Sequence, residues 1–339
     1  MLSVEHKAGT KENVLIHAGN CSLVLLPYLG GKISSLRFGN EELLQAPLAT
    51  PAPRTRTMSF DQGDASGWDE CLPSVAACRV ETAAGPAEIP DHGDLWRVAW
   101  QVKHADERSA TLRGECFSLP LRLERRLELT ETESGCRIAL RYKVTNTGAH
   151  AVPWTWAAHP LFASEPGDTL RLPASISTLR LEGSGGNRLG VNGDTVSWPI
   201  ARLADGRETD LSLALPADAG VGDKLFAGPL APSENWCEIL RPRAGVRIRM
   251  RFDPACTPYL GLWICYGGWP ERPDSKHGPG SGPKQVCIAP EPSTAPVDSL
   301  AATGPWSRTL APGESFRWPM DVELETLNRS SGESEQTHA

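Results

Sequence analysis

Hydrophobic and polar residues alternate with a period of two along much of the chain, which is the pattern of a β-strand with one buried face. The alternation is clearest over Leu119–Leu129 and Cys136–Val144, and Asn146-Thr147-Gly148 follows the second run as a turn. The two long runs predict antiparallel sheet. Shorter strand signals occur at Cys21–Leu26, Arg247–Phe252, Leu260–Tyr266 and Gln285–Ala289.

Turn residues separate these runs, and no long amphipathic helix is evident in the pattern. The 32 glycines and 29 prolines are spread between the strand-like segments. We therefore predict an all-β protein of many short, mostly antiparallel strands packed as a sandwich. Two long segments, Pro47–Gly67 and Gly267–Pro283, are expected to be loops, and loops of this length often carry function. The alternative for both segments is that each is a mobile insertion without a function.

Charge and composition narrow the classes of partner. The 339 residues carry a net charge of -7 without a sustained block of Lys or Arg, which argues against nucleic-acid and anionic-membrane surfaces. No apolar run is long enough to cross a bilayer. The N-terminus shows no secretory signal, so we expect a cytoplasmic protein. One domain is expected over residues 1–327, followed by a polar, disordered tail at 328–339.

The cysteines and several missing motifs weigh against other kinds of chemistry. Nine cysteines, none of them in a Cys-x-x-Cys pair, fit buried thiols better than disulfides or a zinc site, and no metal site is predicted. The sequence has no Gly-x-Ser-x-Gly, phosphate-loop or His-Glu-x-x-His motif. Acyl transfer, nucleotide hydrolysis and zinc proteolysis therefore lose support.

One carboxylate and two imidazoles are the candidate chemistry. Glu291 lies between two prolines that restrict the backbone on both sides. The histidines occur in Asp91-His92-Gly93 and Ala158-His159-Pro160. Each residue alone also fits a structural role. Glu291 fits a solvated loop acid, His92 a turn histidine, and His159 a core histidine bonded to backbone. Together they suggest general acid-base chemistry.

Six short motifs follow one another between Gly19 and Val322. In order, they are Gly30-Gly31-Lys32-Ile33-Ser34-Ser35-Leu36, Gly67-Trp68-Asp69-Glu70-Cys71-Leu72-Pro73, Asp91-His92-Gly93-Asp94-Leu95-Trp96-Arg97, Lys143-Val144-Thr145-Asn146-Thr147-Gly148, His159-Pro160-Leu161-Phe162 and the segment around Glu291. Their order and separations resemble the aldose 1-epimerase family, the galactose mutarotase-like proteins. The resemblance implies a galactose mutarotase-like β-supersandwich whose concave face binds a monosaccharide, with no cofactor.

The activity implied by this resemblance is the interconversion of the α and β anomers of a hexose or related aldose. A base removes the anomeric hydroxyl proton while an acid protonates the ring oxygen, so the ring opens and can reclose as the other anomer. By motif position, Glu291 matches the base, His159 the acid, and His92 the second histidine, which holds the sugar oxygens. The expected partner is a small sugar, and the protein is expected to be a monomer or homodimer.

Further sugar contacts are expected around the same motifs. Arg97, with Asp69 or Glu70, is expected to hydrogen-bond sugar hydroxyls. Asp223 is the best match to a family Asp that precedes an aromatic residue by three positions, and an ion-paired surface aspartate beside Lys224 is the alternative.

The chain has 11 tryptophans against four tyrosines, and indole rings pack well against the C–H faces of sugars. Most of them are expected in the core. The candidates for the site are Trp68, Trp96 and Trp263, the last at a position where galactose-type members have glutamine.

Two departures from the family pattern leave the substrate open. Members near galactose mutarotase carry an Asn-Arg pair where this chain has Trp68-Asp69-Glu70-Cys71, and His159-Pro160-Leu161-Phe162 replaces His-x-Tyr-Phe. One alternative is a non-catalytic carbohydrate-binding protein on the same fold. Because a binder needs no acid-base pair, the presence of His92, His159 and Glu291 together favours an enzyme.

Two enzymatic alternatives also stand. An epimerase-like enzyme for a sugar phosphate or a modified sugar would use basic residues as phosphate ligands, for which the candidates are Arg54, Arg56, Arg97 and Lys224. A lyase or hydrolase acting on oligosaccharides would require an open groove and, for hydrolysis, usually a second carboxylate. Asp69, Glu70 and Asp94 are the candidates for that carboxylate.

Overall fold

The computed structural model describes residues 12–270 and 282–327. In this part of the chain nearly all regular structure is β-strand, and the helices are single 3₁₀ turns. None of these turns is long or apolar enough to cross a membrane. The predicted tail at 328–339 lies outside the described residues.

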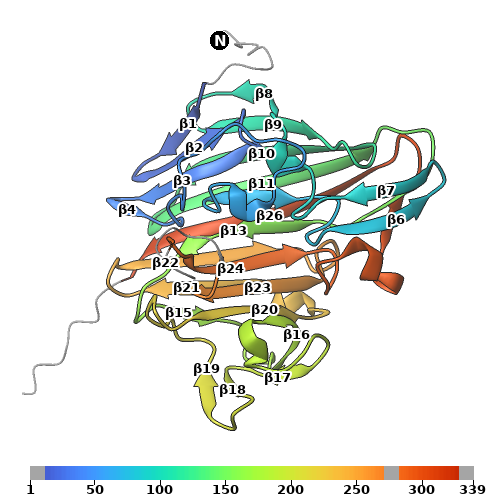
Figure 1. Ribbon diagram of the computed structural model, residues 1–339. Helices are drawn as coiled ribbons and strands as arrows, with labels where there is room; N and C mark the ends of the chain where they lie inside the picture. Colours follow the sequence, from blue (N-terminus) through green and yellow to red (C-terminus); the bar gives the residue numbers. More distant parts are fainter. Residues whose placement is uncertain (1–11, 271–281, 328–339) are drawn as a thin grey trace, which may run out of the picture.

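The larger of the two main sheets contains twelve strands (Figure 1). In sheet order they are β1 (Val14–Ala18), β2 (Cys21–Leu26), β3 (Lys32–Phe38), β5 (Trp68–Cys71), β13 (Ala157–Pro160), β24 (Val286–Ser293), β23 (Tyr259–Tyr266), β20 (Val221–Ala227), β16 (Thr178–Ser184) and β17 (Thr195–Ser197), with β4 (Glu41–Glu42) on β3 and β14 (Phe162–Ala163) on β24. Strands far apart in sequence are thus neighbours: β5 pairs with β13, and β13 with β24.

The second main sheet contains eight strands. In sheet order they are β15 (Thr169–Arg171), β21 (Trp236–Arg241), β22 (Val246–Phe252), β26 (Ser315–Thr326), β11 (Gly135–Asn146), β10 (Leu121–Glu131), β9 (Ser109–Glu115) and β8 (Gln101–Ala105). The long predicted runs are confirmed as β10 and β11, which pair antiparallel. The shorter runs are confirmed as β2, β22, β23 and β24.

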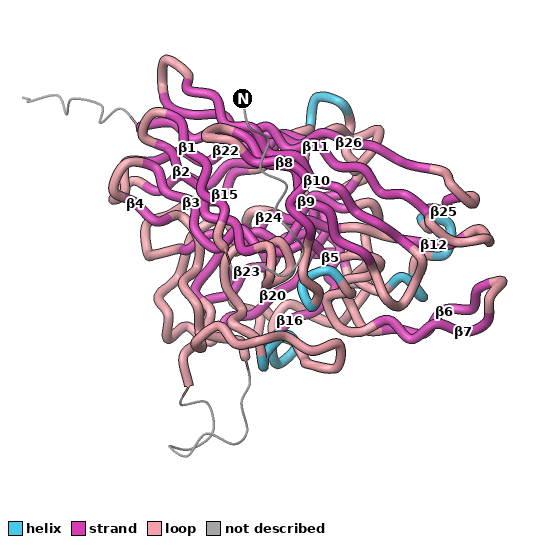
Figure 2. The backbone as a smooth tube through the Cα atoms, turned by 90° about the horizontal axis from the view of Figure 1, so that it is seen from above, coloured by secondary structure: helices cyan, strands magenta, loops and turns pink. Residues whose placement is uncertain are grey.

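Three small two-stranded sheets and six 3₁₀ turns complete the described structure. The small sheets are β12 (Val152–Trp154) with β25 (Arg308–Leu310), β18 (Ile200–Arg202) with β19 (Glu208–Asp210), and β6 (Cys78–Thr82) with β7 (Gly85–Ile89). The 3₁₀ turns are η1 (Phe60–Gln62), η2 (Leu95–Arg97), η3 (Gly185–Asn187), η4 (Pro232–Glu234), η5 (Leu300–Ala302) and η6 (Gly304–Trp306). Figure 2 shows β6 and β7 projecting at one side of the molecule.

The core lies between the two main sheets. Leu23 and Leu36 of the larger sheet belong to the same buried cluster as Leu123 and Leu140 of the smaller one. Because side chains alternate between the two faces of a strand, this packing uses only one face of the larger sheet. Its other face is left to carry polar groups. All nine cysteines are free thiols; six of them are buried, as predicted, and three are half-buried.

Candidate active site

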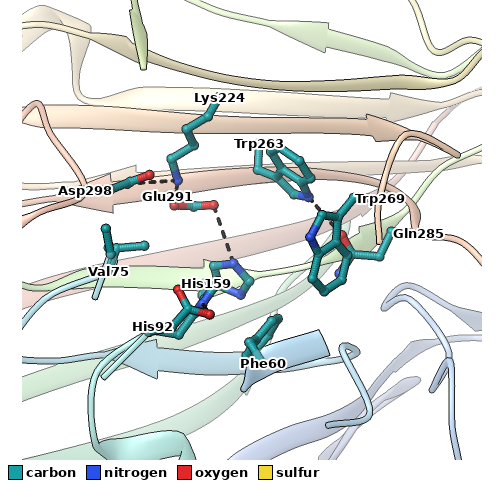
Figure 3. A pocket seen from close by; sticks show the side chains of 12 residues that line it. Phe60, Val75, His92, His159, Lys224, Trp263, Trp269, Gln285, Glu291 and Asp298 are labelled. Carbon is teal, nitrogen blue, oxygen red and sulfur yellow. Dashed lines mark hydrogen bonds and ion pairs between the residues drawn. The ribbon is translucent and has the colours of Figure 1, made fainter. Parts of the chain in front are cut away.

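A pocket with a volume of about 170 Å³ opens on the face of the larger sheet that points away from the core. Strands β13, β20, β23 and β24 form its floor, and loop residues form its walls (Figure 3). The lining residues are Phe60, Val75, Ala76, Asp91, His92, His159, Lys224, Trp263, Trp269, Gln285, Glu291 and Asp298. Five of the residues singled out in the sequence therefore meet in one place: Glu291, His159, His92, Trp263 and Lys224.

Strand register explains why these side chains share a face. Lys224 of β20 lies opposite Trp263 of β23, which lies opposite Ala289 of β24. Directly opposed residues of antiparallel strands point to the same face, and residues two apart in one strand do so too. Glu291 therefore joins Ala289 on this face. The pairing of β13 with β24 places His159 on the same face as Glu291.

Glu291 is the buried centre of the pocket. Its Oε2 accepts a hydrogen bond from the ammonium group of Lys224, while its Oε1 lies 3.8 Å from Nε2 of His159. The two oxygens thus face different partners, as Figure 3 shows. Burial raises the pKa of Glu291 above its ordinary value of 4.5, and the nearby charge of Lys224 opposes that rise.

Lys224 holds this carboxylate in place. Its Nζ also lies 3.5 Å from Oδ1 of Asp298, so one ammonium group is shared between two acids. Burial lowers the pKa of Lys224, but the charges of Asp298 and Glu291 outweigh burial and leave its pKa raised. Lys224 therefore stays positively charged and stabilises the ionised form of Glu291.

His159 is a neutral imidazole in this environment. Burial lowers its pKa well below the ordinary 6.5, and the nearby positive charge of Lys224 lowers it further. Its ring lies edge-on to the rings of His92 and Phe60, with centroid separations of 5.0 and 5.3 Å. A neutral imidazole presents one N–H donor and one acceptor nitrogen.

His92 enters the pocket from a tight turn. It has a positive φ of 58°, and so does the following Gly93, at 67°. A side chain at Gly93 would collide with the backbone of Leu72, so glycine is required there. The imidazole of His92 stacks on Phe60 at 3.9 Å between ring centroids, and its Nδ1 lies 2.9 Å from Oδ2 of Asp91. The ring is thereby fixed in orientation.

Several lining residues were not chosen from the sequence. Phe60 comes from the long loop at 47–67, and Trp269 from the loop at 267–283, of which 271–281 lies outside the described residues. Gln285 accepts a hydrogen bond from the indole N–H of Trp263 at 2.9 Å. In the sequence, the length of the two loops was the feature that could have indicated Phe60 and Trp269 as site residues. Asp298 carried no signal beyond its place in the segment after Glu291.

The structure does not bring Glu70 or Trp68 to the pocket, which corrects their prediction as sugar contacts. Both side chains point from β5 into the core, opposite to Asp69. The carboxylate of Glu70 is fully buried and accepts hydrogen bonds from Arg125 at 2.9 Å and Tyr142 at 3.0 Å, both on the smaller sheet. It therefore joins the two sheets. Trp68 packs near Phe162 in the same interior.

Asp69 of β5 lies opposite His159, but its carboxylate does not line the pocket, because it is ion-paired in the interior. Its oxygens lie 2.8 Å from Nζ of Lys32 and 3.5 Å from Nη1 of Arg54, in a buried cluster that also includes Asp64. The prediction of Asp69 as a sugar ligand is corrected accordingly. Ion pairing in the interior explains the difference, since buried charges need partners.

Arg97 and Trp96 support the pocket wall without lining it, which corrects their prediction as sugar contacts. The guanidinium of Arg97 donates to the backbone carbonyls of Met58 at 2.6 Å and Asp91 at 2.6 Å, and it lies over the ring of Trp96. Burial lowers the pKa of Arg97 to about 10. Trp96 packs edge-on against Phe60. Arg97 thus ties the loop that carries Phe60 to the turn that carries His92.

Asp223 does not reach the pocket, whereas its neighbour Lys224 does. As neighbours in β20 they point to opposite faces, and it is Lys224 that enters the pocket. Asp223 accepts hydrogen bonds from Ser184 at 2.7 Å and from the guanidinium of Arg188 on the other side. Its predicted role as a sugar ligand is therefore corrected. The alternative, an ion-paired surface aspartate beside Lys224, is confirmed in its ion pair, which Asp223 makes with Arg188, but it is wrong in its exposure, because Asp223 is fully buried.

Phosphate and metal ligands are scarce around the pocket. Lys224 is the one lysine or arginine among the described lining residues, and two carboxylates already share its charge. Arg54 is engaged in the buried cluster, and Arg56 lies over the ring of Phe117. Within 12–270 and 282–327, no three His, Cys, Asp or Glu side chains are grouped to hold a metal ion.

No protein-family model matches the chain, and no curated protein sequence matches it. Solved structures do match it. A protein from Synechocystis sp. PCC 6803 superposes with a TM-score of 0.67 at 16% identity, covering 96% of this chain and 100% of that one. A candidate aldose 1-epimerase from Escherichia coli K12 gives 0.65 at 18% identity, covering 93% and 99%.

A galactose mutarotase-like protein from Lactobacillus casei ATCC 334 gives a TM-score of 0.62 at 18% identity, covering 93% of this chain and 100% of that one. At these identities the likeness establishes the fold. The chain has the galactose mutarotase-like fold, as the resemblance of its motifs implies, and it is an all-β sandwich of mostly antiparallel strands.

Proposed function

We propose that this protein, which has the galactose mutarotase-like fold, is an aldose 1-epimerase that interconverts the α and β anomers of a hexose or related aldose. The observation that carries the proposal is the pairing of Glu291 and His159 at 3.8 Å inside a pocket walled by aromatic rings. A base and a donor at that separation can reach the anomeric hydroxyl and the ring oxygen of one sugar, which are bonded to the same carbon.

In this reaction Glu291 takes the proton of the anomeric hydroxyl while the bond between the anomeric carbon and the ring oxygen breaks. The ring oxygen leaves as an alkoxide, and His159 donates a hydrogen bond from its N–H to the negative charge that develops there. A neutral imidazole suits this role, because it can donate a hydrogen bond without first binding a proton. After rotation of the new carbonyl group, the alkoxide attacks the other face of the carbonyl carbon and Glu291 returns its proton to the carbonyl oxygen, which closes the ring as the other anomer.

The remaining groups bind and position the sugar. His92, whose Nδ1 faces Asp91, offers Nε2 to a sugar hydroxyl. The faces of Phe60, Trp263 and Trp269 give the pocket the apolar surfaces against which sugar C–H groups pack. Lys224 keeps Glu291 ionised in a site where burial alone would favour its protonated form.

The direct test is anomer exchange measured by polarimetry or NMR with a panel of aldoses and their phosphates. Anomer exchange of a neutral aldose is expected to be faster than in buffer. A weaker effect is expected on phosphates, since Lys224 is the one lysine or arginine among the described lining residues and its charge is shared by Glu291 and Asp298. If no sugar exchanges faster than in buffer, the epimerase proposal fails. A change in tryptophan fluorescence on sugar addition would then identify a carbohydrate-binding protein.

Replacing His92 by alanine is expected to raise KM and lower kcat together, with kcat/KM falling roughly tenfold, the equivalent of one hydrogen bond. A hydroxyl contact can be tighter in the transition state than in the bound sugar, so both constants respond. Steady-state anomer exchange measures them. His17→Ala, at an exposed histidine paired with Glu107, is the matched control. Unchanged kinetics in the His92 variant would remove it from the site.

Replacing Lys224 by methionine is expected to move the acid limb of the kcat/KM profile to higher pH. Lys224 lowers the pKa of Glu291, so without it the pKa rises further. A base works only when deprotonated, and activity at acidic pH therefore falls more than activity at mildly alkaline pH. Rate measurements across pH test this. Lys224→Arg should keep the wild-type profile, and an unshifted limb in Lys224→Met would contradict the assigned role.

A further inference from the structure

The loop at 47–67, which carries Phe60, is attached to the rest of the molecule mainly by side chains. Over residues 49–63 the turn η1 is the one element of regular structure, and no backbone–backbone hydrogen bond of the described chain joins this stretch to residues outside the loop. Its apolar support is a small buried cluster, separate from the main core, of Leu48, Phe60, Ala65 and Trp96. The position of Phe60 therefore depends on how the polar side chains of the loop are held.

Arg54 reaches from this loop into a buried cluster of four charges. The other members are Lys32 of β3, Asp64 of the same loop and Asp69 of β5. Nη2 of Arg54 lies 2.8 Å from Oδ1 of Asp64, and Nη1 lies 3.5 Å from Oδ1 of Asp69. Burial raises the pKa of Asp64, but the charges of Lys32 and Arg54 outweigh burial and leave its pKa below the ordinary 3.8. Two cations thus balance two carboxylates in the interior.

The same guanidinium group holds the pocket wall beside His92. Nη1 of Arg54 donates to the backbone carbonyl of Trp96 at 2.5 Å, and the group lies over the indole ring at 5.0 Å from its centroid. Trp96 belongs to η2, and its ring packs edge-on against Phe60. Phe60 in turn stacks on the imidazole of His92. One arginine therefore links the loop of Phe60 to the turn that follows His92.

Arginine suits this place because its planar group carries five N–H donors in a fixed geometry. One edge can bind the carboxylate of Asp64 while another binds the carbonyl of Trp96. Lysine would keep the positive charge but has no planar fork to span both acceptors. Methionine would fill similar space, but it would leave Lys32 as the single cation beside two carboxylates.

We propose that Arg54 is a positioning residue of the sugar pocket, which fixes the wall formed by Phe60 and His92 without touching the sugar. This inference rests on the proposed epimerase function. Arg54 is not among the residues that line the pocket, so it acts through the loop. Glu291 and His159 stand on strands of the larger sheet and keep their places without it. Loss of Arg54 therefore weakens sugar binding more than proton transfer.

The first test is the split between KM and kcat for a neutral aldose. Arg54→Met should raise KM at least about tenfold and lower kcat no more than about threefold, because binding contacts are lost and the proton-transfer groups are kept. Arg54→Lys should show a smaller rise. Arg241→Met is the matched control, since Arg241 is also buried and paired with an aspartate, Asp168 at 3.2 Å, but away from the pocket. Equal rises in KM for Arg54→Met and Arg241→Met would overturn the proposal.

A double-mutant cycle with Phe60→Ala tests whether Arg54 acts through the loop. Residues that act as one unit show non-additive effects. Once Phe60 is alanine, adding Arg54→Met should therefore raise KM by no more than about twofold. Effects of the two substitutions that simply multiply would show that Arg54 does not work by holding Phe60, and the proposal would fail.

Amide hydrogen exchange tests the anchoring without any sugar. Residues 49–63 should lose protection in Arg54→Met and keep it in Arg241→Met. If Arg54→Met does not fold, Arg54→Lys, which keeps the buried charge balance, should show the same loss to a smaller degree. Unchanged protection overturns this inference and leaves the epimerase standing. If the wild type accelerates anomer exchange of no sugar, the epimerase fails, and protection of 49–63 still decides whether Arg54 holds the loop.

Discussion

Replacing Glu291 by glutamine is expected to lower kcat for anomer exchange by roughly 10²- to 10⁴-fold, the contribution typical of one positioned proton-transfer group. Glutamine has nearly the same shape, so it can fill the space beside Lys224, but its amide cannot take the proton of the anomeric hydroxyl. The loss should fall mainly on kcat, since sugar binding relies on other groups. Polarimetric or NMR exchange at equal protein concentration measures it.

The matched control for this variant is Asp298→Asn. Asp298 also contacts Lys224, at 3.5 Å, so its replacement removes a neighbouring negative charge while leaving the base intact. A much smaller loss is therefore expected, and thermal unfolding should show both variants folded. An equal loss in the two variants would mean that the charge balance around Lys224, and not proton transfer by Glu291, limits the rate. A wild-type rate in Glu291→Gln would defeat the mechanism.

Replacing His159 by alanine is also expected to lower kcat by roughly 10²- to 10⁴-fold, because the ring oxygen then loses its donor as the ring opens. Glutamine at this position should restore part of the rate, since its amide N–H can still donate a hydrogen bond. His104→Gln, at an exposed histidine paired with Asp106, is the control. Full activity in His159→Ala would remove His159 from the mechanism.

The pH dependence of the wild-type protein gives a second check on His159. Because burial holds its pKa well below 6.5, the imidazole is neutral through the neutral range and does not titrate there. Activity should therefore rise with pH through the raised pKa of Glu291 and then stay level. A decline in kcat/KM as pH passes through 6.5 would instead indicate that the imidazolium form of His159 is required.

Much of the fold could be predicted because strand patterning is local. The period-two alternation marks β10 and β11 almost to their ends, and glycines and prolines mark the turns between strands. The motif order then predicts which polar residues belong together, and the structure places Glu291, His159 and His92 around one pocket. The immediate neighbours of these residues indicate them in the sequence. Glu291 lies between two prolines, His92 precedes a glycine and His159 precedes a proline.

Other site residues could not be predicted, because their roles depend on which side of a strand faces the ligand. Asp223 and Lys224 are adjacent, so a choice between them is a choice of face, and the pairing of β20 with β23 makes that choice. Asp69 and Glu70 differ in the same way. Glu70 faces the core and binds Arg125, whereas Asp69 faces the pocket side and is held by Lys32.

The sequence by itself determined the β-class of this protein, the positions of six of its strands and the three residues on which its proposed chemistry depends. Only the tertiary structure decided that Lys224 is the partner of Glu291 and that Phe60 and Trp269 wall the pocket. Alternation along one strand says that neighbours point apart. Which of them meets the ligand depends on pairing between strands distant in sequence, and their pKa values depend on the burial that this pairing creates.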